Sequence, residues 1–143
     1  MKPTSYKRPF LLIVLAFAFL IPAWFGLVRF QQAFANRALI AELKIVPGLW
    51  YFALTGAIWA LTALTAAVCL WLRLKMAVPV ARSAVLLLVL YYWADRLAFT
   101  RSTATAVNGP FALGLTVLLG AAAFAILAQP RQHLFFHHPR KSD

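Results

Sequence analysis

The run YYWADR at positions 91–96 holds the side chains of this sequence that are best suited to chemistry. Its carboxylate, Asp95, lies 13 positions after Arg82, which is about 20 Å along a helix at about 1.5 Å per residue. If Arg82 marks one membrane boundary, Asp95 lies inside the outer part of the hydrocarbon. An unpaired charge at that depth costs several kcal/mol, so we expect Asp95 to have a partner or to reach water.

Helical spacing predicts the neighbours of this run, because residues four apart share a helix face. It places Tyr91 beside Asp95 and Tyr92 beside Arg96. The candidate ion-pair partners of Asp95 are Arg96 after local rearrangement, Arg101, and Arg29 at the end of the first apolar run.

Two interpretations of the run stay open. A functional site in an outward-facing pocket would respond to protons or ions, or would anchor a polar head group. A structural salt bridge would instead fix the depth and rotation of its helix at the interface. The candidate polar site consists of Asp95, Arg96, Tyr91, Tyr92 and Arg101.

Apolar stretches of membrane-spanning length must position these side chains. The chain has 143 residues, of which 64% are hydrophobic, whereas soluble domains are about half apolar. About 20 consecutive apolar residues cross the hydrocarbon. We therefore predict an all-α membrane protein, a four-transmembrane-helix bundle in a single membrane domain, 1–143. The predicted spans are about 9–29, 48–72, 83–99 and 109–128.

Two segments outside the spans complete the domain. The connector at about 30–46 is predicted to be a short helix that lies on the outer surface or extends the first span, and a basic tail covers 129–143. The first apolar run is longer than the apolar region of a signal peptide, which has about 7–15 residues. We therefore expect the run to be retained, although Ala33-Phe34-Ala35 offers a small-x-small cleavage pattern.

The distribution of Lys and Arg predicts the orientation, since cytoplasmic segments carry the excess of basic residues. With the N-terminus inside, nine basic residues face the cytoplasm and five face the opposite side. We therefore expect a multi-pass protein of a bacterial inner membrane with both termini in the cytoplasm. The nine are Lys2, Lys7, Arg8, Arg73, Lys75, Arg82, Arg131, Arg140 and Lys141. The five are Arg29, Arg37, Lys44, Arg96 and Arg101.

Aromatic side chains gather near the outer ends of the predicted spans. Trp and Tyr favour the water–lipid interface, so an interfacial belt is one interpretation, and the wall of an outward-facing pocket is the other. The residues concerned are Trp24, Trp50, Tyr51, Tyr91, Tyr92 and Trp93.

Small residues repeat along two spans at spacings of four, three and four. Because close approach favours helix association in lipid, we predict that both stripes lie inside the bundle, with contact between the two as one option. The alternative is that Ala and Gly are common in membrane helices without a packing role. The stripes are Gly56, Ala60, Ala63 and Ala67 in the second span, and Ala112, Thr116, Gly120 and Ala123 in the fourth.

The C-terminal tail is basic and contains three histidines. His133 and His137 have a spacing found in metal sites, but Pro139 interrupts the helix and no second cluster completes a site. We favour an interfacial anchor, in which Phe135 and Phe136 enter the head groups while basic neighbours contact anionic lipid at the cytoplasmic face.

Several function classes are disfavoured by the sequence. The net charge of +11 accompanies a chain too apolar for a nucleic-acid-binding domain. No Ser-His-Asp arrangement, HExxH, CxxC, P-loop or GxGxxG motif occurs. We therefore expect no enzymatic activity, no cofactor, no bound metal and no nucleic-acid partner.

The segments GLWYFALTGAIWALTALTAAVCLW, VLYYWADRLAF and NGPFALGLTVLL follow one another along the chain. In this order they resemble small four-span bacterial integral membrane proteins that are uncharacterised, so the resemblance implies a fold and no activity. The leading hypothesis is a non-enzymatic structural, accessory or interaction subunit with a membrane-protein partner or a second copy of itself. The alternative is a small transporter or channel component that uses the outward-facing aromatic and Asp-Arg site.

Overall fold

The computed structural model describes residues 10–44, 48–99 and 108–128. These residues form helices and turns and contain no strand. The predicted all-α fold, with four helices long and apolar enough to cross a membrane, is confirmed. The helices are α1 (Phe10–Ala35), α2 (Arg37–Glu42), α3 (Leu49–Trp71), α4 (Ala77–Phe99) and α6 (Gly109–Ala128).

Helix α4 begins earlier than the charge-free pattern indicates. The span was expected from position 83, whereas the helix starts at Ala77 and includes Pro79 and Arg82. Proline is tolerated there because the amides of a helix's first turn have no acceptor within the helix. With 23 residues, α4 is about 35 Å long, which exceeds the hydrocarbon thickness of about 30 Å.

The first part of the connector after Arg29 extends the first span, as one of the two predictions had it, and a short helix follows. Residues up to Ala35 extend α1 to 26 residues, and the short helix α2 follows after Asn36. The predicted tail, 129–143, lies outside the described residues.

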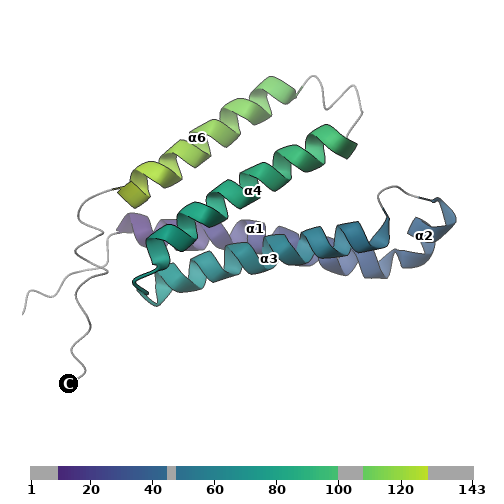
Figure 1. The fold of residues 1–143 in the computed structure, drawn as a ribbon, viewed down its shortest axis with the longest axis horizontal. Helices are drawn as coiled ribbons and strands as arrows, with labels where there is room; N and C mark the ends of the chain where they lie inside the picture. Colours follow the sequence, from purple (N-terminus) through teal and green to yellow (C-terminus); the bar gives the residue numbers. More distant parts are fainter. Residues whose placement is uncertain (1–9, 45–47, 100–107, 129–143) are drawn as a thin grey trace, which may run out of the picture.

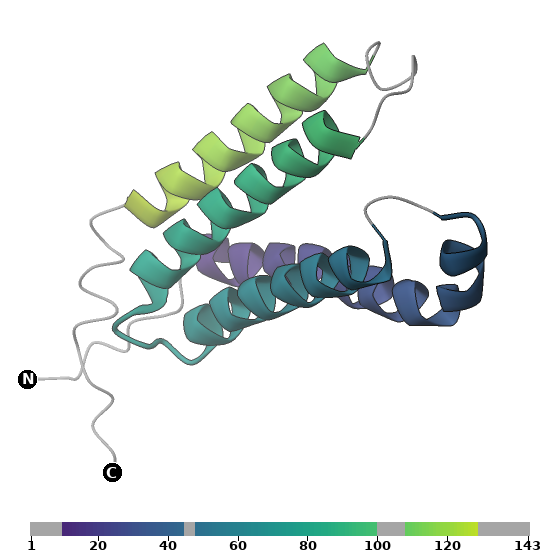
Figure 2. The same ribbon diagram turned by 45° about the vertical axis from the view of Figure 1, so that its right-hand side comes forward.

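The four long helices form two antiparallel pairs, α1 with α3 and α4 with α6 (Figure 1). We call the end at which α1 begins and α3 ends the proximal end, and the opposite one the distal end. The pairs come together at the proximal end, where a short turn joins α3 to α4, and diverge toward the distal end (Figure 2).

The turn between α3 and α4 is built by a Schellman motif. The Leu74 amide donates to the Cys69 carbonyl at 3.1 Å, and Arg73 between them has a φ of 58°. This left-handed residue reverses the chain within a few positions. As a result, α4 starts directly beside the end of α3.

The buried core lies in the proximal half of the bundle and is rich in alanine. Small side chains let helix backbones approach closely, which matters in lipid because hydrophobic attraction between helices is weak there. Helix α6 contributes Ala123 and Leu127 to this core. Its other residues are half-buried or exposed.

Helices α1 and α3 come closest at two glycines. A Cβ atom placed on Gly26 would lie 2.5 Å from the Ala60 nitrogen and 2.7 Å from the Gly56 oxygen. A Cβ atom on Gly56 would lie 2.7 Å from the Phe30 nitrogen and 2.8 Å from the Gly26 oxygen. These distances to backbone atoms are too short for any side chain, so this crossing requires glycine on both helices.

The two small-residue stripes have different partners. All four residues of the α3 stripe are buried, and Gly56 and Ala60 of that stripe contact α1. On α6, Thr116 and Gly120 line a hollow against α4, and a Cβ atom on Gly120 would meet no atom within 4 Å. The prediction that both stripes lie inside the bundle therefore holds for the α3 stripe. In the α6 stripe only Ala123 is buried, because Thr116 and Gly120 face the hollow.

We expect Gly56→Ala to destabilise the protein. Alanine gains about 0.5–1 kcal/mol over glycine in a helix, but forcing a methyl group into a closely packed contact costs about 1–3 kcal/mol. The net effect is a lower midpoint in thermal unfolding of the detergent-solubilised protein. Gly114→Ala is the control, because a Cβ atom there meets no atom within 4 Å. A Gly56→Ala midpoint at or above that of the wild type would contradict the close crossing.

Candidate functional site

Asp95 of α4 is held by side chains from two other helices. Arg29 of α1 forms a forked ion pair with it, with Nη1 2.6 Å from Oδ2 and Nη2 3.3 Å from Oδ1. The Tyr51 hydroxyl of α3 donates to Asp95 Oδ1 at 2.5 Å. We call these three residues the distal clamp, since they join α1, α3 and α4 near the distal end.

The position of the clamp follows from the glycine crossing. Arg29 lies three residues after Gly26 on α1, and Tyr51 lies five residues before Gly56 on α3. The close contact of the two glycines therefore brings both donors to the same level of the bundle. The Arg29 guanidinium also lies 5.3 Å from the ring centroid of Phe52, which is within the range of a cation–π contact.

Long side chains suit this location because the helix pairs have already diverged there (Figure 2). The arginine and the tyrosine extend from the α1–α3 pair, and the short aspartate on α4 receives them. The pair is half-buried, with 26% of each of the Arg29 and Asp95 side chains exposed. Within the described residues, Arg29 Nε is buried and has no hydrogen-bond acceptor.

The other candidates from the sequence have different positions. Arg96 donates to the Tyr92 hydroxyl at 3.0 Å, so the spacing of four residues predicted this contact correctly. Tyr91 forms no hydrogen bond to Asp95 among the described residues, where the clamp supplies the donors instead. Arg101 lies outside the described residues.

Tyr51 was missed as a partner of Asp95. Its position in the sequence assigns it to the outer aromatic group, at the same predicted membrane level as Asp95, but its pairing with Asp95 depends on the rotation of α3. That group divides in the structure, because Trp24 and Trp50 are exposed as in an interfacial belt, whereas Trp93 lines the hollow between α4 and α6.

The clamp leaves Asp95 little capacity for a further ligand. A carboxylate has about four acceptor positions, and Arg29 and Tyr51 occupy three of them. Within the described part of the chain, no group of three or more His, Cys, Asp or Glu side chains is placed to hold a metal ion. The geometry thus favours a structural ion pair over a reactive site.

Comparisons of the chain with known proteins give no match among protein-family models, curated proteins or solved structures.

Asp95→Asn should destabilise the bundle by leaving the Arg29 charge without its counterion. Removing one partner of a fully buried pair costs about 3–5 kcal/mol. Because both side chains are 26% exposed, we expect a smaller loss of about 1–3 kcal/mol, measured by unfolding in detergent. Arg29→Gln combined with Asp95→Asn should lose less than the sum of the single losses, since neither charge is then alone.

Glu42→Gln is the control for removing an acid. Because Glu42 is exposed on α2, this substitution should leave the free energy of unfolding unchanged. Strictly additive losses in the Arg29 and Asp95 variants would show that the two side chains are not coupled.

Proposed function

We propose that this chain is a multi-pass protein of the bacterial inner membrane that acts as a non-enzymatic structural, accessory or interaction subunit. The observation that carries the proposal is that Asp95, the acid within a predicted span, is bonded to side chains of two other helices. Asp95 is engaged by Arg29 and Tyr51 in joining three helices, which makes it part of a scaffold.

The surface of α6 supports an interaction role. This helix packs mainly against α4 and contributes only Ala123 and Leu127 to the buried residues. Packing between helices, more than apolar character, stabilises association in lipid. A helix with so little packing inside its own chain has most of its surface available for a second copy of the chain or for a partner's membrane helix.

A small transporter or channel component is the second candidate, favoured by the partial exposure of the clamp. Since 26% of the Asp95 side chain is accessible, a water path from the distal end would allow Asp95 to act with its neighbours Arg96, Tyr91, Tyr92 and Arg101 as a site for ions or polar head groups. This function requires water to reach positions 91–96, which a scaffold does not.

The proposal is tested by purifying the tagged full-length protein in mild detergent after expression at a low level. We expect a complex of fixed stoichiometry, either with another membrane protein or with a second copy. A lone monomer in repeated preparations would count against a subunit role.

Accessibility separates the two candidate functions. Single cysteines at positions 91–96, introduced into a Cys69→Ala background, should resist polar thiol reagents in membranes if the chain is a scaffold. A cysteine at Lys44, which is exposed near the distal end, is the positive control for labelling. Rapid labelling at 91–96 would favour the transporter or channel function.

The proposal includes the orientation of the chain in the membrane, with both termini in the cytoplasm. The excess of basic residues supports cytoplasmic termini and a tail that contacts anionic lipid at that face. We expect a C-terminal reporter that is active only in the cytoplasm to show activity, and a reporter active only outside to show none. The reverse pattern would invert the topology.

A further inference from the structure

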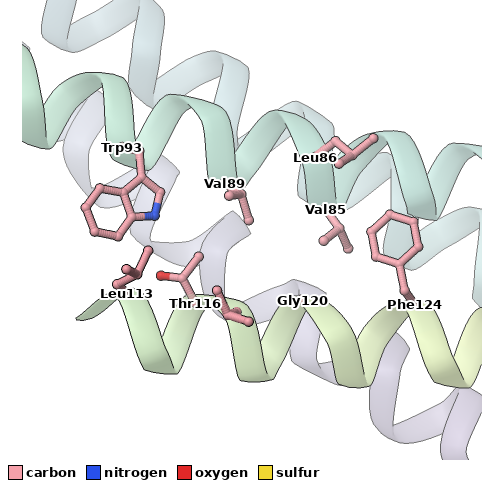
Figure 3. Close-up of a pocket in the computed structure, with 9 residues that line it drawn as sticks. Val85, Leu86, Val89, Trp93, Leu113, Thr116, Gly120 and Phe124 are labelled. Atoms are coloured by element: carbon pink, nitrogen blue, oxygen red, sulfur yellow. The ribbon is translucent and has the colours of Figure 1, made fainter. Parts of the chain in front are cut away.

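Helices α4 and α6 enclose an apolar groove of about 370 Å³. Side chains of both helices face each other across it, as Figure 3 shows. Trp93 with Leu113 stands at the distal end of the groove, and Phe124 faces Val85 at the proximal end. Thr116 and Gly120 lie between them, so the middle of the groove is wide because its wall there is made of small residues.

The groove offers almost no polar group to a ligand. The Thr116 hydroxyl donates to the carbonyl of Ala112 on its own helix at 2.7 Å. Apart from the indole N–H of Trp93, the other lining side chains are hydrocarbon. Such a groove suits an alkyl chain.

A cation stands at the proximal end of the same groove. Arg82 lies three residues before Val85, and helical spacing puts it on the α4 face that carries Val85, Val89 and Trp93. Its Nη2 donates to the carbonyl of Leu127 on α6 at 3.0 Å. Among the described residues, its Nε has no acceptor although it is buried.

Arg82 has no carboxylate partner among the described residues. The basic residues described at the proximal end are Arg73, Lys75 and Arg82, whereas the described acids, Glu42 and Asp95, both lie toward the distal end. Asp95 is also paired with Arg29. An anion would supply the counterion that the described residues do not give Arg82.

The length of the groove separates two kinds of occupant. Its wall runs from Leu113 to Phe124 on α6, which is about 16 Å at about 1.5 Å per residue. One leaflet contributes half of the hydrocarbon, about 15 Å. A partner's membrane helix of about 30 Å would extend well beyond this wall, whereas a single acyl chain has a length close to that of the wall.

We propose that the α4–α6 groove binds one anionic phospholipid, with an acyl chain along Thr116 and Gly120 and the head-group phosphate at Arg82. The concave wall surrounds the chain with more contacts than a convex helix surface offers, and each contact adds dispersion energy. The guanidinium selects the charged head group. This site is independent of whether the chain also works as a subunit.

The test is native mass spectrometry of the full-length protein in mild detergent, titrated with phosphatidylglycerol or with phosphatidylcholine of the same acyl chains. The wild type should bind one phosphatidylglycerol about fivefold more tightly than phosphatidylcholine, since one basic side chain near the head group contributes about 1 kcal/mol. Arg82→Gln should abolish this preference while weak binding of both lipids persists. Lys75→Gln, which removes an exposed cation at the same end, should keep the preference.

A second pair of variants tests the groove itself. Gly120→Leu places a side chain into open space and should weaken the binding of both lipids about tenfold without lowering the thermal midpoint. Gly114→Leu is the matched control, because Gly114 is equally open and does not line the groove. This pair decides the proposal even if Arg82→Gln fails to fold.

Three results would overturn the proposal. They are unchanged lipid binding in Gly120→Leu, equal losses in Gly120→Leu and Gly114→Leu, and a preference for phosphatidylglycerol that survives in a folded Arg82→Gln variant. Loss of a co-purified protein from Gly120→Leu with lipid binding intact would assign the groove to a helix instead.

Discussion

The close crossing of α1 and α3 at Gly26 and Gly56 is the contact on which the rest of the bundle depends. In lipid, helices gain little from apolar surface alone, so backbone approach must supply the association energy. With Cβ positions only 2.5–2.8 Å from the facing backbone, the crossing also fixes the rotation of each helix. That rotation aims Arg29 and Tyr51 toward α4. The pair of donors that binds the Asp95 carboxylate is thus a consequence of two residues that carry no side chain.

The two ends of the bundle are stabilised by different interactions, close packing at the proximal end and polar side chains at the distal end. At the proximal end, alanines on all four long helices and the short α3–α4 turn keep the helices close, so packing is sufficient. At the distal end the pairs have separated (Figure 2), and polar side chains span the distance. Further hydrogen bonds help an ion pair to offset the cost of desolvating its charges, and the tyrosine hydroxyl supplies a third hydrogen bond to the carboxylate. The ion pair and the tyrosine hydrogen bond hold α4 against α1 and α3. Helix α6 packs mainly against α4.

The position of each charge relative to the membrane explains its partner. Asp95 lies near the distal end, where the chain supplies its own cation. Arg82 lies near the proximal end, where the described residues supply a carbonyl oxygen but no carboxylate. A carbonyl accepts a hydrogen bond without neutralising a charge, so these two charges have different requirements. The first is met by Arg29 within the chain, and among the described residues the second is met only by the Leu127 carbonyl.

The sequence by itself determined the secondary structure and its membrane character, because both follow from local hydrophobicity over about 20 residues. It also determined the contact of Tyr92 with Arg96, since partners four residues apart on one helix need no tertiary information. The start of α4 was predicted too late in the sequence, because Pro79 and Arg82 are compatible both with a loop and with the first turns of a helix. Only the tertiary structure decided that Arg29 and Tyr51 pair with Asp95 and that the α6 stripe lines a groove. Those outcomes depend on helix rotation and on which spans are neighbours. Rotation is set by backbone contacts such as Gly26 with Gly56, whose two members lie in different spans and carry no joint signal in a single sequence.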